Sequence, residues 1–207
     1  MQDADPGHDL AHVRRVVNAA VRIGEAEGAA AEVVLPAAWL HDCVVVPKNS
    51  PQRSQASRMA AERAAIFLGE VEYESALIPA IEHAIVAHSF SARVVPETIE
   101  AKVVQDADRL EAIGALGLAR CLMTGGAMGT QLVDSEEPFP VNRIADDAVS
   151  SVDHLFVKLL RLPQMMQTNS GRVMAGKRAE FLKRFLRELA DELYVDQEIL
   201  ERALTKI

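Results

Sequence analysis

The stretch from Ala37 to Val46, read as AAWLHDCVVV, places a histidine and an aspartate side by side in strongly apolar surroundings. Uncharged residues from Val33 to Leu40 lead into His41 and Asp42, and three valines follow soon after. Burying an ionised carboxylate beside an imidazole costs several kcal/mol unless a partner compensates the charge. A divalent cation is such a partner. We therefore hypothesise that His41 and Asp42 are two ligands of a metal held inside the protein.

Two other segments offer further metal ligands. His12 lies at the edge of an apolar helical stripe with Asp9 one turn earlier, which suits a metal ligand whose second ring nitrogen is held by a carboxylate. The alternative is a surface histidine at the start of a helix. In the segment QDADRL, Asp106 projects into the apolar stripe of its helix, and Asp108 lies on the opposite side. Periodicity alone favours Asp106 as the buried acid.

A cationic loop follows the His–Asp pair, with the sequence PKNSPQRSQAS. It carries Lys48 and Arg53, and Ser54 is a plausible N-cap for the next helix, which also contains Ser57. Cationic and hydroxyl groups that lead into a helix N-terminus can bind phosphate. The alternative interpretation is a solvated loop.

Two more histidines, His83 and His88, belong to one predicted helix that starts at Pro79. Residues five apart do not share a helix face, so both are not expected to bind one ion directly. One of them could contact a phosphate or a metal-bound water while the other packs. Further along, His154 and Lys158 are four residues apart on one face of a helix.

Helices are the expected scaffold for all these residues, because apolar side chains recur at helical spacing along most of the chain. No convincing strand or internal repeat is found. A polar segment at 133–147 with two prolines is the best candidate for a lid or mobile loop. The segment TGGAMG is expected to be a turn. The helices are predicted near 9–27, 32–45, 55–68, 79–89, 97–110, 114–123, 147–162 and 172–204, with a break near Tyr194 in the last.

Composition excludes several functional classes. The chain has 22 basic and 30 acidic residues and a formal net charge of −8, which argues against a general nucleic-acid or acidic-membrane binder. No apolar run approaches the roughly 18 residues of a membrane span, and the polar start does not resemble a signal peptide. Cys43 and Cys121 are interpreted as reduced core thiols, which indicates a cytoplasmic protein.

The order H … HD … D on a helical scaffold resembles the HD-domain metal-dependent phosphohydrolase superfamily, and in particular its small bacterial branch of predicted HD hydrolases. The resemblance depends on DLAHVRRV, AAWLHD, VPKNSPQRSQASRMAAERA, AIVAHSF, EAKVVQDADRLEAIGALGLAR and HLFVKLLRLPQMMQT, which span most of residues 7–190. It implies an all-α fold, an HD-domain helical bundle with a C-terminal helical extension. We expect a single domain over 1–207, with its core at about 7–125 and its C-terminal helices at about 147–204.

The resemblance also implies which residues bind the metal, namely His12, His41, Asp42 and Asp108. Asp108 replaces the choice made from periodicity, and Asp106 becomes an acid that supports a ligand or positions water. Some HD enzymes carry a catalytic acidic pair soon after the HD, but this chain has Val44 to Lys48 there, so that role is not transferred. The GYP signature of the binuclear branch is absent, so one metal ion is expected.

A metal-dependent phosphohydrolase is the leading functional hypothesis, with water attacking a phosphate ester or pyrophosphate of a nucleotide or related small molecule. The nitrogen and oxygen ligands suit Mn²⁺, Fe²⁺, Ni²⁺, Mg²⁺ or Zn²⁺, and the absence of sulfur argues against a purely structural zinc site. In this hypothesis the ion would activate the attacking water. The supporting residues would be Lys48, Arg53 and Lys158 for substrate binding, and His83, His88 and Asp106 for catalysis.

Two other classes of function remain open. One is a non-catalytic sensor, in which the metal site binds a nucleotide and changes a protein contact. The other is a helical structural module in which the His–Asp pair is a buried ion pair. No nucleic-acid polymer or membrane is expected as a partner. The sequence does not fix the oligomeric state, and a homodimer is among the alternatives.

Overall fold

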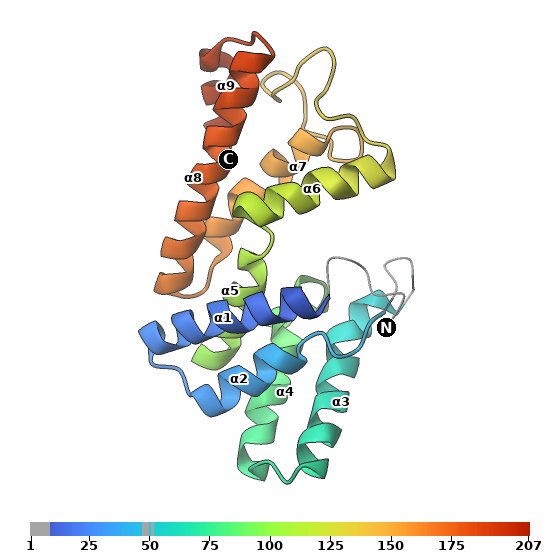
Figure 1. Cartoon of the computed structure of the whole chain (residues 1–207), viewed down its shortest axis with the longest axis vertical. Helices are drawn as coiled ribbons and strands as arrows, with labels where there is room; N and C mark the ends of the chain where they lie inside the picture. Colours follow the sequence, from blue (N-terminus) through green and yellow to red (C-terminus); the bar gives the residue numbers. More distant parts are fainter. Residues whose placement is uncertain (1–8, 47–49, 51) are drawn as a thin grey trace. The chain divides into compact units, whose positions relative to one another are not determined.

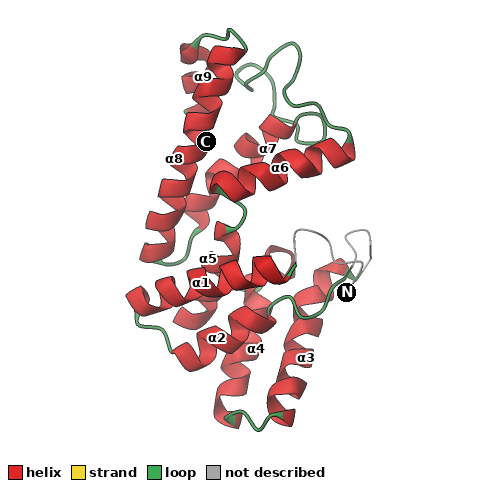
Figure 2. Cartoon of the chain, in the orientation of Figure 1, coloured by secondary structure: helices red, strands yellow, loops and turns green. Residues whose placement is uncertain are grey.

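The computed structural model describes residues 9–46, 50 and 52–207, except for the side chain of Arg53 (Figure 1). These residues form helices joined by loops, and no strand occurs among them (Figure 2). An isolated parallel bridge joins Gln131 and Ser150. The prediction of an all-α protein is confirmed. The α-helices in this part of the chain are α1 (Leu10–Glu27), α2 (Ala31–Leu40), α3 (Ala56–Glu70), α4 (Ile78–His88), α5 (Ile99–Leu110), α6 (Gly114–Met128), α7 (Ser151–Val157), α8 (Asn169–Glu192) and α9 (Gln197–Leu204).

The chain divides into two compact units. The first contains the described residues up to Glu111 together with Gln167–Gly171, and the second contains Ala112–Met166 and Arg172–Ile207. The candidate metal ligands, His12, His41, Asp42 and Asp108, all belong to the first unit. The expectation of a single domain over the whole chain stays a prediction.

In the first unit, α1 and α2 pack together and both pack on α5, while α4 packs against α2, α3 and α5. Helices α3 and α4 run side by side and are joined by a short connection (Figure 1). The apolar stripes predicted from helical spacing meet in this core, which explains why these helices are stable together. Fully buried side chains of the core include Val16, Ala20, Ile23, Ala37, Ile81, Ile85, Val103 and Leu110.

The ends of α1 and α2 place the first candidate ligands. Asp9 is the N-cap of α1, and its side chain accepts a hydrogen bond from the backbone nitrogen of His12 at 2.8 Å. Asp9 therefore caps the helix, and this contact does not support the expectation that it holds the His12 ring. Helix α2 ends at Leu40 instead of near residue 45, so His41 and Asp42 lie in the turn that follows it.

Other helix boundaries also differ from the prediction. Ser54 belongs to a 3-10 helix, η1 (Arg53–Gln55), and the N-cap of α3 is Gln55, which makes no side-chain capping bond. The TGGAMG segment is part of α6, which continues to Met128. A Cβ atom at Gly125 would lie 2.0 Å from Ser151 Oγ, so a glycine allows this close approach of α6 to α7. Packing thus outweighs the low helix propensity of glycine.

In the second unit, the polar segment predicted as a lid is anchored. Arg143 donates hydrogen bonds to both carboxylate oxygens of Asp153, which is fully buried on α7. The Glu137 side chain accepts from the backbone nitrogens of Val141 and Asn142, and Phe139 is fully buried. A buried ion pair and a buried aromatic ring are the contacts of a fixed segment, so they do not support the prediction of a mobile lid.

The end of the chain contains two helices where the sequence indicated one broken helix. Between α8 and α9, Tyr194 has a φ of 56° and is almost fully exposed, which confirms the predicted break. The predicted helix at 147–162 is shorter, because α7 ends at Val157 and a 3-10 helix, η4 (Leu159–Met165), follows. Among the described residues, no helix has the length and apolar character needed to cross a membrane.

Candidate metal centre

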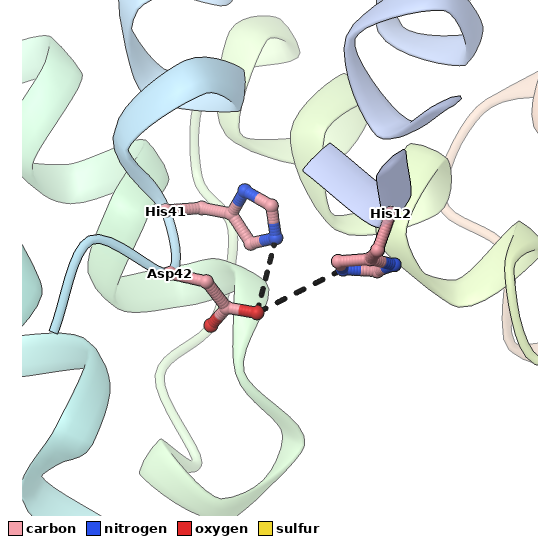
Figure 3. Close-up of side chains that lie close together, drawn as sticks. All are labelled: His12, His41 and Asp42. Carbon is pink, nitrogen blue, oxygen red and sulfur yellow. Dashed lines mark ion pairs between the residues drawn. The ribbon is translucent and has the colours of Figure 1, made fainter. Parts of the chain in front are cut away.

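Side chains from α1 and from the turn after α2 converge in the first unit. His12, His41 and Asp42 each offer a ligand atom, and these atoms all lie within 4.8 Å of one another. Figure 3 shows a nitrogen of each imidazole ring facing the same carboxylate oxygen of Asp42. One carboxylate oxygen, Asp42 Oδ2, lies 3.8 Å from His12 Nε2 and 3.4 Å from His41 Nε2. Both histidines are buried, at 2% and 0% exposure.

Of the two acids in QDADRL, Asp108 is the one that reaches this cluster. Its Oδ1 atom lies 3.5 Å from His12 Nε2 and 4.0 Å from His41 Nε2. Asp106 instead accepts hydrogen bonds from the backbone nitrogens of Gln167 and Thr168. A catalytic role for Asp106 stays a prediction that these contacts do not support.

Local backbone geometry fixes the ring of His41. Its Nδ1 atom lies 2.8 Å from the carbonyl oxygen of Ala38, which favours a proton on Nδ1 and leaves Nε2 facing the carboxylates. Burial acts to lower the His41 pKa, but the nearby carboxylates of Asp42 and Asp108 outweigh it and raise the pKa. The two carboxylates therefore favour a positive charge at His41 Nε2. A proton or a divalent cation can supply that charge.

His88 also faces the cluster, from the last position of α4. Its Nε2 atom lies 3.7 Å from Asp42 Oδ1, and its ring is 4.9 Å from that of His41 in an edge-on arrangement. Burial and the positive charge of His41 lower the His88 pKa. His83, in contrast, accepts a hydrogen bond from the backbone nitrogen of Glu97 at 3.0 Å. The structure therefore separates two histidines that the sequence left equivalent.

A glutamate and an arginine beside the cluster were missed by the sequence reasoning. Glu111 is buried, and its Oε2 atom lies 2.5 Å from Arg15 Nε and 3.8 Å from His12 Nδ1. Burial acts to raise the Glu111 pKa, but the nearby imidazole of His12 and the hydrogen bond from Arg15 outweigh it, so the net change in pKa is downward. The available signal was spacing, because Arg15 follows His12 by three residues and Glu111 follows Asp108 by three.

The predicted substrate-binding residues are placed less fully. Lys48 and the side chain of Arg53 lie outside the described residues. Lys158 belongs to the second unit, where it is exposed at the C-terminal end of α7. Cys43 was expected to be a core thiol but is exposed, and its Sγ atom donates a hydrogen bond to the carbonyl oxygen of Ala60.

The residues present fit a divalent metal ion. Imidazole Nε2 atoms and carboxylate oxygens face one another at 3.4–4.0 Å, an arrangement that a shared cation stabilises. In His41 the Nε2 atom is buried and forms no hydrogen bond with the described residues. Two imidazoles and two carboxylates suit the borderline and hard cations expected from the sequence. His12, His41, Asp42 and Asp108 would hold the ion.

Comparison with known proteins identifies the family. The model of the HD domain family matches residues 9–113. The uncharacterized protein YpgQ of Bacillus subtilis is 36% identical over 197 residues, which cover 93% of this chain and 88% of that protein. A crystal structure of YpgQ in complex with ADP aligns with a TM-score of 0.68, at 36% identity, and covers 90% of this chain and 87% of that one.

A second solved structure supports the same placement. An HD-superfamily hydrolase from Bacillus thuringiensis aligns with a TM-score of 0.72 at 30% identity, covering 94% of this chain and 91% of that one. The chain therefore belongs to the HD domain family. The resemblance expected from H … HD … D is confirmed. HD domains bind divalent metals, and membership of this family supports a metal-dependent hydrolase.

Proposed function

We propose that the protein is a metal-dependent phosphohydrolase that cleaves a phosphate ester or pyrophosphate of a nucleotide or related small molecule. The observation that carries the proposal is the convergence of His12, His41, Asp42 and Asp108 on one point. A divalent ion bound there would supply an activated water and charge neutralisation for a phosphoryl oxygen. The complex of YpgQ with ADP, at 36% identity, supports a nucleotide as the substrate class.

His88 is the chain's best candidate for proton transfer or phosphate contact. It is buried beside the metal ligands, and its Nδ1 atom lies 2.5 Å from the carbonyl oxygen of Ile85. With the proton on Nδ1, its Nε2 atom presents a lone pair toward the side of the cluster where Asp42 Oδ1 lies, 3.7 Å away. We assign this role to His88 in preference to His83, whose Nε2 atom is occupied by Glu97.

The segment after the His–Asp pair is proposed to bind the phosphate. Its helix η1 packs against η3 (Phe90–Ala92), which begins two residues after His88. Ser57, in the first turn of α3, has a buried hydroxyl that makes no hydrogen bond with the residues that the structure describes. The roles of Lys48, Arg53 and Lys158 in substrate binding remain part of the proposal. So does a cytoplasmic location.

The decisive experiment measures phosphate and pyrophosphate release from a panel of nucleotides in the presence of Mn²⁺. We expect turnover by the unaltered chain and none by His41→Ala. Nucleotide binding without turnover would support the sensor hypothesis instead. An empty site after purification without chelator and exposure to excess metal would contradict the metal centre and favour a buried ion pair.

A matched pair of variants tests the assignment of His88. His88→Ala should lower kcat by about 100-fold or more, in the range of a lost acid–base or phosphate contact. His83→Ala should leave kcat within a few-fold, because its contact with Glu97 is structural. A loss below about 10-fold in His88→Ala would remove this residue from the catalytic group.

A further inference from the structure

The ring of His12 lies between two sets of acidic groups. Its Nε2 atom faces the candidate ligands, 3.8 Å from Asp42 Oδ2 and 3.5 Å from Asp108 Oδ1. Its Nδ1 atom faces the other way and lies 3.8 Å from Glu111 Oε2. His12 is 2% exposed, so these neighbours and not solvent decide which nitrogen carries the proton.

The rings of the other two histidines in the cluster are oriented by backbone carbonyls. His41 and His88 lie at the C-terminal ends of their helices, and each Nδ1 atom is paired with the carbonyl oxygen three residues earlier. Carbonyls in the last turn of a helix have no intrahelical donor, so they are available to accept from an imidazole. The backbone alone can hold these two rings.

His12 has a different position, because it lies in the first turn of α1. The carbonyl three residues earlier belongs to Asp9 and is used within the helix, where it accepts a hydrogen bond from the backbone nitrogen of Val13 at 3.2 Å. An acceptor for the His12 ring is offered by another element. The end of α5 supplies one in Glu111, the residue that follows its last helical position.

Arg15 fixes the carboxylate of Glu111 from the opposite side. Its Nε atom lies 2.5 Å from the same Oε2 atom that faces His12. Glu111 is 2% exposed, and a buried carboxylate keeps a defined position only when cationic or N–H groups satisfy it. Residues three apart on each helix thus form two linked contacts between α1 and α5. In one contact the His12 ring faces the Asp108 carboxylate, and in the other the Arg15 guanidinium contacts the Glu111 carboxylate.

We propose that Glu111 is a positioning residue for His12. Its carboxylate accepts a hydrogen bond from the Nδ1–H group of the His12 ring, which keeps the lone pair on Nε2, where the metal would bind. Arg15 holds Glu111 in place for this task. An outer carboxylate of this kind fixes the tautomer of a histidine ligand and raises its basicity. The inference depends on the metal-binding part of the proposed function, but not on the identity of the substrate.

The test compares Mn²⁺ affinity by titration calorimetry in the full-length chain after treatment with a chelator. Glu111→Gln keeps the size of the side chain but removes its charge, and we expect about 10–100-fold weaker binding. Arg15→Met should weaken binding less, because the Glu111 carboxylate remains. Glu100→Gln is the matched control. Glu100 lies in the first turn of α5, and its carboxylate accepts a hydrogen bond from the backbone nitrogen of Ala30 instead. The control variant should bind Mn²⁺ as the unaltered chain does.

A spectroscopic readout separates positioning from a general effect on the fold. Nitrogen NMR of the imidazoles should show the His12 proton on Nδ1 in the unaltered chain and a mixture of tautomers in Glu111→Gln, with His41 unchanged. A His12 proton on Nε2 in the unaltered chain would overturn the inference without any variant. So would Mn²⁺ binding in Glu111→Gln within a few-fold of the unaltered chain, or an equal loss in Arg15→Met. Absence of Mn²⁺ binding by the unaltered chain would overturn the proposed function as well.

Discussion

Two aspartates on the same turn of α5, Asp106 and Asp108, have opposite surroundings. Asp106 is fully buried, and its carboxylate accepts from Gln167 N at 2.9 Å, Thr168 N at 2.8 Å and Thr168 Oγ1 at 2.7 Å. The Asp108 side chain is 29% exposed and lies beside the imidazole of His12. The carboxylate of the more buried acid is thus satisfied by backbone and hydroxyl donors. The less buried one faces groups that are themselves candidate metal ligands.

This difference teaches that burial alone does not identify a functional acid. Periodicity correctly predicted that Asp106 is the buried residue of the pair, yet the structure places Asp108 in the cluster. The buried acid of the second unit, Asp153, follows the pattern of Asp106, because Arg143 and the backbone nitrogen of Asp146 satisfy it. A more useful signal is the kind of partner. An acid satisfied by N–H and O–H donors is structural, as Asp106 is, whereas an acid that faces the Nε2 atoms of two histidines, as Asp108 does, is a candidate ligand.

The largest effect is expected for Asp108→Asn. Losing a direct ligand should lower Mn²⁺ affinity and nucleotide turnover by more than about 100-fold, beyond the range for an outer partner of a ligand. The free energy of unfolding in metal-free buffer should change by less than about 1 kcal/mol, as is common when a functional charge is removed. Calorimetric titration and urea denaturation measure the two quantities. Near-normal Mn²⁺ binding would contradict the comparison of the two aspartates.

The reverse pattern is expected for Asp106→Asn. An amide at this position would turn an N–H group toward the donors of Thr168, so one buried donor would lose its acceptor. The free energy of unfolding should fall by about 1–3 kcal/mol. Mn²⁺ affinity, measured well below the unfolding transition, should stay within a few-fold of the unaltered chain. If Asp106→Asn instead abolished Mn²⁺ binding and left stability intact, Asp106 would be a ligand and the choice of Asp108 over Asp106 would be wrong.

Much of this protein can be predicted from its sequence, because apolar spacing locates the helices of the core. The helix predicted near 9–27 is α1, and Gly28 ends it in the left-handed conformation that glycine favours. The order H … HD … D indicates the family and the resemblance names the four candidate ligands. The sequence is sufficient to predict features that depend on residues close together in the chain, such as helix positions and helix ends.

The remaining features depend on contacts between distant segments. Glu111 and His12 are 99 positions apart, so the orientation of the His12 ring by Glu111 is visible only once α1 packs on α5. Asp9 is near His12 in sequence and was chosen for that reason, although its side chain is used by the helix start. In the same way, the fixed position of Arg143 depends on Asp153, which a reading of the loop alone does not include.

The smallest effect on stability is expected for variants of Thr168, which donates a hydrogen bond to Asp106. Thr168 Oγ1 donates to Asp106 Oδ2 at 2.7 Å and accepts from the backbone nitrogen of Gly171 at 2.9 Å. Thr168→Val keeps the shape but removes both hydrogen bonds, so the free energy of unfolding should fall by about 1–2 kcal/mol. Thr168→Ser keeps the hydroxyl and should lose less. A loss in Thr168→Ser as large as that in Thr168→Val, measured by urea denaturation, would contradict this prediction, because it would mean that the methyl group contributes as much as the two hydrogen bonds. Because the contacts of Thr168 are with the structural acid, Mn²⁺ affinity should be unchanged in both, which distinguishes this side of α5 from the side that carries Asp108.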